Sequence, residues 1–230
     1  MMARAVGLAW VFLDVGGPLF SDAAYFSALF EAIRERAPGL QRQAYDERFA
    51  QLRAAQSEGF TEALVGEFVT DESAHTAVRR RADVMWERTG YGPDEVFPDV
   101  VDTLRVLAKR YRLACITNHF SWVRDRAAAA GFADMVDVWA ISAEVGAEKP
   151  DERIFRFALQ RAGVRAENVA MVGDRLDMDL VPAKRLGMRT IWVLRNEAPD
   201  SPTPEQLAIP DAAVPSLAEV PAVLDHIDSE

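Results

Sequence analysis

Cysteine is almost absent from this sequence, which contains one among 230 residues. A single thiol cannot form a disulfide within the chain, so the sequence favours a reducing compartment, and we expect a cytoplasmic protein. That residue, Cys115, lies inside an apolar run. This position is typical of a thiol buried in a strand rather than of a catalytic nucleophile.

Long hydrophobic runs are also missing. No stretch is long enough to span a bilayer, so we expect no membrane partner. Basic residues are absent from the C-terminal tail: after Arg195 there is no Lys or Arg but eight acids, and the whole chain has a net charge of −10. Because nucleic-acid binding needs a basic surface, we expect no nucleic-acid partner. A small phosphate ligand remains compatible with this charge, since it needs only local donors or a metal ion.

The residues that are present predict a layered α/β fold. Hydrophobic residues make up 50% of the chain, and many form short apolar runs separated by segments with helical spacing. The runs predict strands at 8–13, 113–117, 136–141, 169–172 and 190–194. Strands alternating with helices indicate a Rossmann-like parallel sheet. The proline-rich stretch 199–215 is predicted to be an extended loop, followed by a short final helix.

Residues 21–89 depart from this alternation. Apolar residues recur there at three- and four-residue spacing with charges between them, which predicts an all-helical segment. The segment follows one strand and precedes the next, and turn-rich residues 90–98 close it. We therefore predict a core domain made of residues 1–20 and 90–230, with a helical domain inserted at 21–89.

Polar side chains follow several of the predicted strands. The carboxyl ends of parallel strands meet at one edge of a sheet, so these groups should converge although they lie far apart in sequence. They are Asp14, Thr117 and Asn118, Lys149, Asp174 and Asp179.

Their chemistry is consistent with phosphoryl transfer. Mg²⁺ prefers oxygen ligands and is usually held by one or two carboxylates together with a substrate phosphate, a role that suits Asp14 and Asp174. The Thr117 hydroxyl and the Lys149 ammonium can hold the remaining phosphoryl oxygens. A carboxylate can also attack phosphorus and form an aspartyl-phosphate, which divides hydrolysis into two easier steps.

Each residue also has a structural explanation. Asp174 could cap the following helix, and Asp179 could be a first-turn acid favoured by the helix dipole. Lys149 could be a solvated surface charge, and Thr117 an ordinary strand residue. These explanations lose weight because the residues occur together, in this order, at strand ends.

The ordered set resembles the four motifs of the haloacid dehalogenase superfamily, and the helical insertion resembles its type-1 cap. The motifs are Asp14-x-Gly-Gly-x-Leu, Thr117-Asn118, Lys149-Pro150 and Gly173-Asp174-x-x-x-x-Asp179. The resemblance covers nearly the whole chain and implies a mobile cap over the active site. It implies that Asp14 is the nucleophile, that Thr117 and Lys149 contact the phosphate, and that Asp174 binds Mg²⁺. Asp179 would support the metal, and the backbone carbonyl of Gly16 would be a further ligand.

One position departs from the superfamily's phosphatase pattern. Two residues after the nucleophile those phosphatases usually carry a second Asp as general acid and base, whereas this chain has Gly16, and the usual threonine two residues later is Pro18. Losing a general acid or base typically lowers a rate by roughly 10²–10⁴-fold. His119, next to Asn118, could face substrate and partly replace the missing acid, because a histidine titrates near neutrality. The other explanation is a loop histidine that only packs.

The sequence therefore favours a Mg²⁺-dependent phosphatase that acts on a small phosphorylated metabolite. We expect its substrate-binding residues to be Thr117, Asn118, His119 and Lys149. Two alternatives remain. A dehalogenase needs no proton donor to its leaving group, but the halide-displacing members lack the metal-binding acids that this chain keeps. A protein that binds Mg²⁺ and phosphate without turnover would explain Gly16 and Pro18. Both monomer and homodimer remain open.

Overall fold

A six-stranded sheet forms the centre of the computed structural model, which describes residues 7–56, 59–92 and 95–227. Parts of the predicted domains, at residues 1–6, 57–58 and 228–230, and part of the predicted turn, at 93–94, lie outside the described residues. All neighbouring strands are parallel, in the order β3-β2-β1-β4-β5-β6. The strands are β1 (Trp10–Leu13), β2 (Arg112–Thr117), β3 (Val138–Ile141), β4 (Val169–Gly173), β5 (Arg189–Val193) and β6 (Ala212–Val214). The parallel α/β fold predicted from the sequence is confirmed.

The proline-rich stretch 199–215 was predicted wrongly as an extended loop. It contains the short helix α10 (Pro204–Leu207) and the edge strand β6 (Ala212–Val214), which pairs with β5. Pro210 and Pro215 bracket the strand rather than interrupt it, and the strand is only three residues long. Proline is tolerated at an edge because one side of such a strand needs no ladder hydrogen bonds.

Alternate residues of the strands face two separate hydrophobic cores. In β1, Val11 and Leu13 belong to the core under α5, α6 and α11, whereas Trp10 and Phe12 belong to the core under α8 and α9. All four are buried, as expected for a central strand covered on both faces. The covering helices are α5 (Val100–Leu107), α6 (Val123–Ala129), α7 (Ser142–Val145), α8 (Glu152–Ala162), α9 (Val181–Arg185) and α11 (Val220–Ile227).

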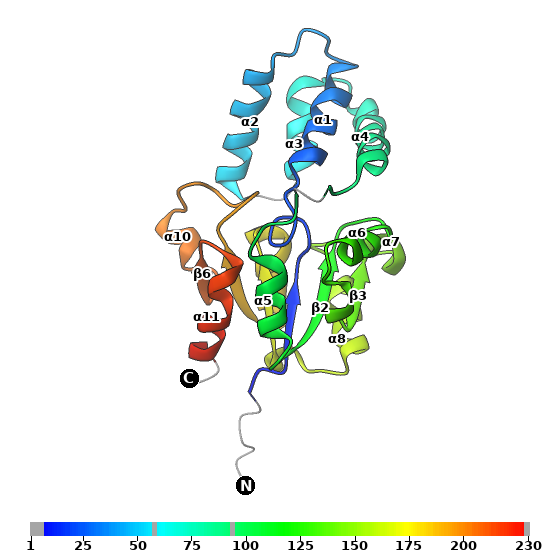
Figure 1. Ribbon diagram of the computed structural model, residues 1–230. Helices are drawn as coiled ribbons and strands as arrows, with labels where there is room; N and C mark the ends of the chain where they lie inside the picture. The colour runs from blue at the N-terminus through cyan, green and yellow to red at the C-terminus, as the bar shows by residue number, and fades with distance from the viewer. Residues whose placement is uncertain (1–6, 57–58, 93–94, 228–230) are drawn as a thin grey trace.

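Four further helices form a separate layer beyond the carboxyl edge of the sheet (Figure 1). They are α1 (Ala23–Arg34), α2 (Arg42–Ala55), α3 (Phe60–Phe68) and α4 (His75–Thr89), and we call them the helical layer. They enclose their own hydrophobic core, which includes Leu29, Ile33, Leu64 and Ala82. No helix in the described ranges is both long enough and apolar enough to cross a membrane.

The strand order reverses beside β1. After β1 and the helical layer the chain continues to β2 and β3 on one side, and it then crosses to β4, β5 and β6 on the other. In open parallel sheets the crevice at such a reversal, beyond the carboxyl ends of the strands, is where ligands bind. Asp14 directly follows β1 and Asp174 directly follows β4, so both carboxylates lie at that crevice.

Candidate active site

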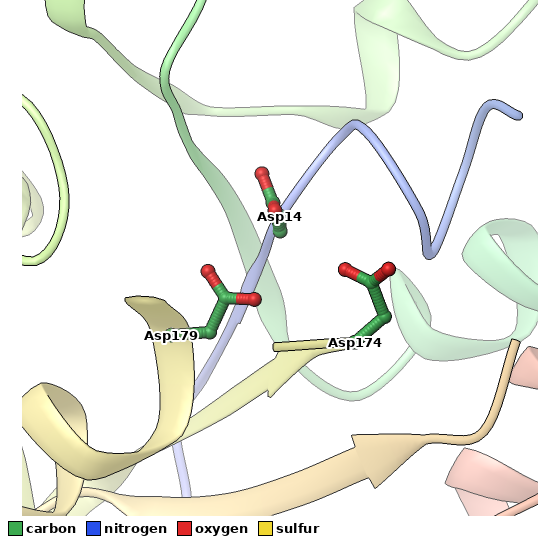
Figure 2. A group of neighbouring side chains, drawn as sticks. All are labelled: Asp14, Asp174 and Asp179. Carbon is green, nitrogen blue, oxygen red and sulfur yellow. The ribbon is translucent and has the colours of Figure 1, made fainter. Parts of the chain in front are cut away.

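Three carboxylates meet at the crevice between β1 and β4. Figure 2 shows Asp14 at the end of β1, Asp174 just beyond β4, and Asp179 on the single π-helical turn η5 (Leu176–Leu180). Each offers an oxygen atom, and these atoms lie within 4.8 Å of one another. Asp14, Asp174 and Asp179 are 8%, 1% and 0% exposed. We call these three residues the acid cluster.

The loop after β1 lets Asp174 approach closely. Gly17 adopts φ +90°, a conformation that L side chains rarely adopt, and a Cβ there would overlap the Asp174 carboxylate. The Asp174 carboxylate does not cap the following helix. Its Oδ2 accepts a hydrogen bond from the backbone N–H of Glu197 at 3.0 Å. The absence of a side chain at Gly17 therefore leaves room for a carboxylate that follows another strand.

Lys149 is the cation of the acid cluster. Its Nζ lies 2.7 Å from Oδ2 of Asp14 and 2.6 Å from Oδ1 of Asp179, and its side chain is 3% exposed. The Asn118 amide holds it in place from both sides: Oδ1 accepts from the backbone N–H of Lys149 at 2.7 Å, and Nδ2 donates to its carbonyl at 2.9 Å. The structure thus gives Asn118 a positioning contact with Lys149.

The buried charges of the site do not balance. Burial raises the pKa of Asp14 to about 7, against the opposing effect of the Lys149 ammonium. Burial also raises the pKa of Asp174 well above its ordinary value, and the charges of Glu197 and Asp179 add to the effect. Although burial opposes it, the carboxylates of Asp14 and Asp179 raise the pKa of Lys149. Carboxylates at such close range favour an added cation.

A cavity of about 1290 Å³ opens between the acid cluster and the helical layer. Its lining includes Asp14, Gly16, Thr117, Asn118, His119 and Lys149, all of which the sequence singled out. The helical layer contributes Tyr25, Thr61, Arg79 and Asp83 from the opposite side. The structure therefore brings the predicted site residues to one place, with room for a small molecule.

The His119 ring is surrounded by aromatic side chains. Its ring is 4.4 Å from the Trp122 ring, 4.6 Å from that of Trp86 and 5.3 Å from that of Tyr91, between ring centres. Burial lowers the pKa of His119 to about 4. At neutral pH the ring is therefore uncharged and holds no readily available extra proton.

Sequence patterns did not identify Asn196 and Glu197, which contact Asp174 from the loop after β5. Asn196 adopts φ +54° and its Nδ2 lies 3.4 Å from Oδ2 of Asp174, and Glu197 follows it. Arg175 pairs with Asp177 at 2.6 Å and with Glu197 at 2.7 Å. Asn196 and Glu197 follow the end of β5, and polar residues after a strand end were the available signal. The sequence-based prediction did not use this signal, because it treated the residues after Arg195 only as an acidic tail.

Comparison with known proteins identifies the family. A family model described as haloacid dehalogenase-like hydrolase matches residues 8–187. Among solved structures, a haloacid dehalogenase-like family hydrolase from Streptococcus pneumoniae has a TM-score of 0.75 at 17% identity, covering 94% of this chain and 98% of that one. A 2-haloacid dehalogenase from Pseudomonas syringae has a TM-score of 0.61 at 23% identity, covering 96% and 99%. At these identities the two structures show the shared fold.

Several curated relatives are phosphatases. A glyceraldehyde 3-phosphate phosphatase from Methanothermobacter thermautotrophicus is 31% identical over 196 residues, which are 84% of this chain and 76% of that protein. A phosphoserine phosphatase from Thermus thermophilus is 41% identical over 109 residues, 47% of this chain and 42% of that protein. The chain spans about half the length of several curated relatives that it matches, including 57% of a glyceraldehyde 3-phosphate phosphatase from Methanopyrus kandleri.

Proposed function

We propose, from the premise that this chain belongs to the haloacid dehalogenase-like hydrolase family, that it is a Mg²⁺-dependent phosphatase. Its substrate would be a small phosphate monoester, and Asp14 would form an aspartyl-phosphate. The observation that supports this most is the acid cluster with Lys149 at the reversal of strand order. The phosphatase names of curated relatives point to the same reaction class.

The donor set of the acid cluster fits Mg²⁺. Its ligand atoms are all carboxylate oxygens, and burial with mutual repulsion raises the pKa values of Asp14 and Asp174. Hard oxygen donors of this kind are those that Mg²⁺ selects. Asp14, Asp174 and Asp179 would hold the ion, which would supply positive charge against the phosphoryl oxygens.

The chain's own residues supply the remaining chemistry. The Asp14 carboxylate is held by the backbone N–H of Val15, which donates to Oδ1 at 2.7 Å, so its position is fixed before substrate binds. Lys149 would hold phosphoryl oxygens and offset the charge that repels an attacking carboxylate. Thr117, which is 2% exposed and lines the cavity, would donate its hydroxyl to another phosphoryl oxygen.

We assign the helical layer the role of a cap that closes over substrate. The layer forms one wall of the cavity and has its own core, so it can move as a unit against the sheet. Closure would limit water at the phosphorus and present Tyr25, Thr61, Arg79 and Asp83 to the part of the substrate beyond the phosphate. Substrate choice would then depend on these four residues.

Turnover of phosphate esters tests the proposed function. We expect para-nitrophenyl phosphate and at least one member of a phosphometabolite panel to release phosphate with Mg²⁺ and to release none when EDTA removes the metal. Inorganic phosphate release is the measurement. Chloride release from a 2-chloro acid, without phosphate release, would instead support a dehalogenase. Binding of phosphate without any turnover would support a non-catalytic protein.

Metal binding should stabilise the fold, and more so at alkaline pH. The folded pKa values of Asp14 and Asp22, about 7 and about 8, are above their ordinary 3.8. The metal-free folded state therefore binds protons that the unfolded chain has released, so its stability should fall as pH rises from about 4 to about 8. Mg²⁺ competes with the proton on Asp14, which is one of its proposed ligands. Above about pH 8, Mg²⁺ at about 100 times its Kd should raise the free energy of unfolding by about 2.7 kcal/mol.

Thermal unfolding with and without Mg²⁺, near pH 6 and near pH 8, measures this effect. Asp174→Asn should remove most of the Mg²⁺-induced rise in Tm, because it removes one of the three carboxylates. Equal rises at both pH values, or a rise that survives Asp174→Asn, would contradict the assignment of the acid cluster as the metal site.

A further inference from the structure

The side-chain space that Gly16 leaves empty is filled by another carboxylate. A Cβ built on Gly16 would lie 2.7 Å from Oδ2 and 2.8 Å from Oδ1 of Asp22. Gly16 is not among the glycines with positive φ, so its backbone could carry a side chain. What prevents one is the Asp22 carboxylate, which stands where a side chain at position 16 would begin.

The Asp22 side chain is turned into the site and away from its own helix. Asp22 is the N-cap residue of α1, yet its side chain makes no cap hydrogen bond. The Ser21 hydroxyl accepts from the backbone N–H of Ala23 instead, at 3.3 Å. Asp22 is 8% exposed and lines the same cavity as Asp14. An N-cap aspartate gives up a stabilising contact of about 1 kcal/mol when it leaves its helix, so this orientation calls for another explanation.

Two hydrogen-bond donors fix the Asp22 carboxylate over the loop after β1. The Tyr91 hydroxyl donates to Oδ1 at 2.6 Å, and Asn196 Nδ2 donates to Oδ2 at 3.0 Å. Tyr91 is stacked on Phe20, with ring centres 4.2 Å apart. Asn196 has a left-handed backbone, which few residues other than glycine, asparagine and aspartate adopt readily. The carboxylate is thus held on both oxygens by groups that are themselves fixed.

We propose that Asp22 is the general acid and base of the reaction, contributed from the start of the helical layer in place of the carboxylate missing at Gly16. This inference rests on the proposed phosphatase function. In the first step an Asp14 oxygen bonds to phosphorus, the bond from phosphorus to the ester oxygen breaks, and its electron pair stays on that oxygen. The ester oxygen takes the proton of the Asp22 carboxyl and leaves as the alcohol.

The second step restores both aspartates. The Asp22 carboxylate takes a proton from water while the water oxygen bonds to phosphorus. The bond between phosphorus and the Asp14 oxygen breaks, and its electrons return to the Asp14 carboxylate. The sum is a phosphate monoester plus water giving an alcohol plus inorganic phosphate, with Asp14 ionised and Asp22 protonated again.

Two phenyl esters with different leaving groups test the role of Asp22. Nitrophenolate leaves without a proton, whereas phenolate from phenyl phosphate needs one. We expect Asp22→Asn to lower turnover of phenyl phosphate by roughly 10²–10⁴-fold. With para-nitrophenyl phosphate the first turnover should fall less than about tenfold, and a burst of one nitrophenolate per site should precede a slow phase, because water attack on the aspartyl-phosphate still lacks its base. Rapid-mixing kinetics with Mg²⁺ measure both esters.

Two further variants separate catalysis from structure. Ser21→Ala alters the neighbouring side chain at the start of α1 and should leave the ratio of the two ester rates unchanged. The exchange Gly16→Asp with Asp22→Gly moves the carboxylate to position 16, into space that Asp22 vacates, and should recover much of the phenyl phosphate rate that Asp22→Asn loses. If Asp22 only connected Tyr91 to Asn196, its substitution would not change the ratio of the two ester rates.

Equal loss on both esters without a burst, or an Asp22→Asn rate within about threefold of wild type on phenyl phosphate, would overturn the proposal. If Asp22→Asn fails to fold, Asp22→Gly with Gly16 unchanged takes its place, and the same loss on phenyl phosphate and the same burst with para-nitrophenyl phosphate are expected. Failure of the phosphatase function has a different signature, because wild type would then release no phosphate from either ester.

Discussion

Asparagine at position 14 is expected to lower turnover of every phosphate ester by at least roughly 10⁴-fold while leaving the protein folded. The amide has nearly the size of the carboxylate and can still accept the hydrogen bond from Val15 that Asp14 receives. It is too weak a nucleophile to form the covalent intermediate. Lys149 keeps its ion pair with Asp179 at 2.6 Å, so no buried cation is stranded.

Stability should change little or rise in Asp14→Asn near pH 8. Burial raises the pKa of Asp14 to about 7, so above that pH the native carboxylate is ionised at a cost that asparagine avoids. The loss of activity would then be chemical rather than structural. Steady-state phosphate release and Tm, measured on the same preparation, check both halves of the expectation.

The matched control is Asp177→Asn. Asp177 is also a buried aspartate and lies on η5, but its carboxylate pairs with Arg175 and is not part of the acid cluster. We expect this variant to lose stability, because Arg175 loses the carboxylate of its 2.6 Å ion pair, and to retain turnover within about tenfold. Substantial activity in Asp14→Asn, or equal inactivation of both variants, would refute Asp14 as the nucleophile.

Lys149→Met is expected to lower the free energy of unfolding by about 3–5 kcal/mol near pH 8. The lysine lies between Asp14 and Asp179 and is 3% exposed, so its removal leaves two buried carboxylates facing each other without a cation. The loss should be smaller near pH 6 than near pH 8. Lys149 lowers the pKa of Asp14, so without the lysine that pKa lies above the wild-type value of about 7. The folded variant therefore holds the Asp14 proton more tightly than wild type does, and it gains more stability as the pH falls. Mg²⁺ should restore part of the stability near pH 8, whereas turnover should stay low because phosphoryl oxygens lose a cation.

Urea unfolding at both pH values, with and without Mg²⁺, measures this prediction. Lys184→Met is the control. Lys184 also pairs with an aspartate, Asp211 at 3.2 Å, but its side chain is 43% exposed, so we expect a change of less than about 1 kcal/mol. A Lys149→Met variant as stable as this control, or one equally destabilised at both pH values, would show that Lys149 does not neutralise the acid cluster.

The sequence predicted the sheet and the convergence of the strand-end residues because both follow from local patterns and one geometric rule. Apolar runs located five of the strands, and parallel pairing then placed Asp14 and Asp174 at one edge. The edge strand at 212–214 was missed because its three residues lie between prolines, where composition indicates a loop. Such a strand forms only because β5 offers it a partner.

Side-chain direction was beyond the reach of sequence patterns. Aspartate before a helix predicts a cap, and nothing in the local sequence around Asp22 indicates that its carboxylate turns toward Gly16 instead. That turn depends on Tyr91 and Asn196, which are 69 and 174 residues away in the chain. The missing acid was visible in the sequence, but the group that fills its place was visible only in three dimensions.

The shared volume of Gly16 and Asp22 has an evolutionary consequence. An aspartate gained at position 16 alone would collide with the Asp22 carboxylate, and a glycine gained at position 22 alone would leave no carboxylate in that volume. Each single substitution should therefore be harmful, while the two together restore an equivalent arrangement. On the proposed role of Asp22, the two positions would show reciprocal sign epistasis, so a lineage with one arrangement is expected to keep it unless both positions change together.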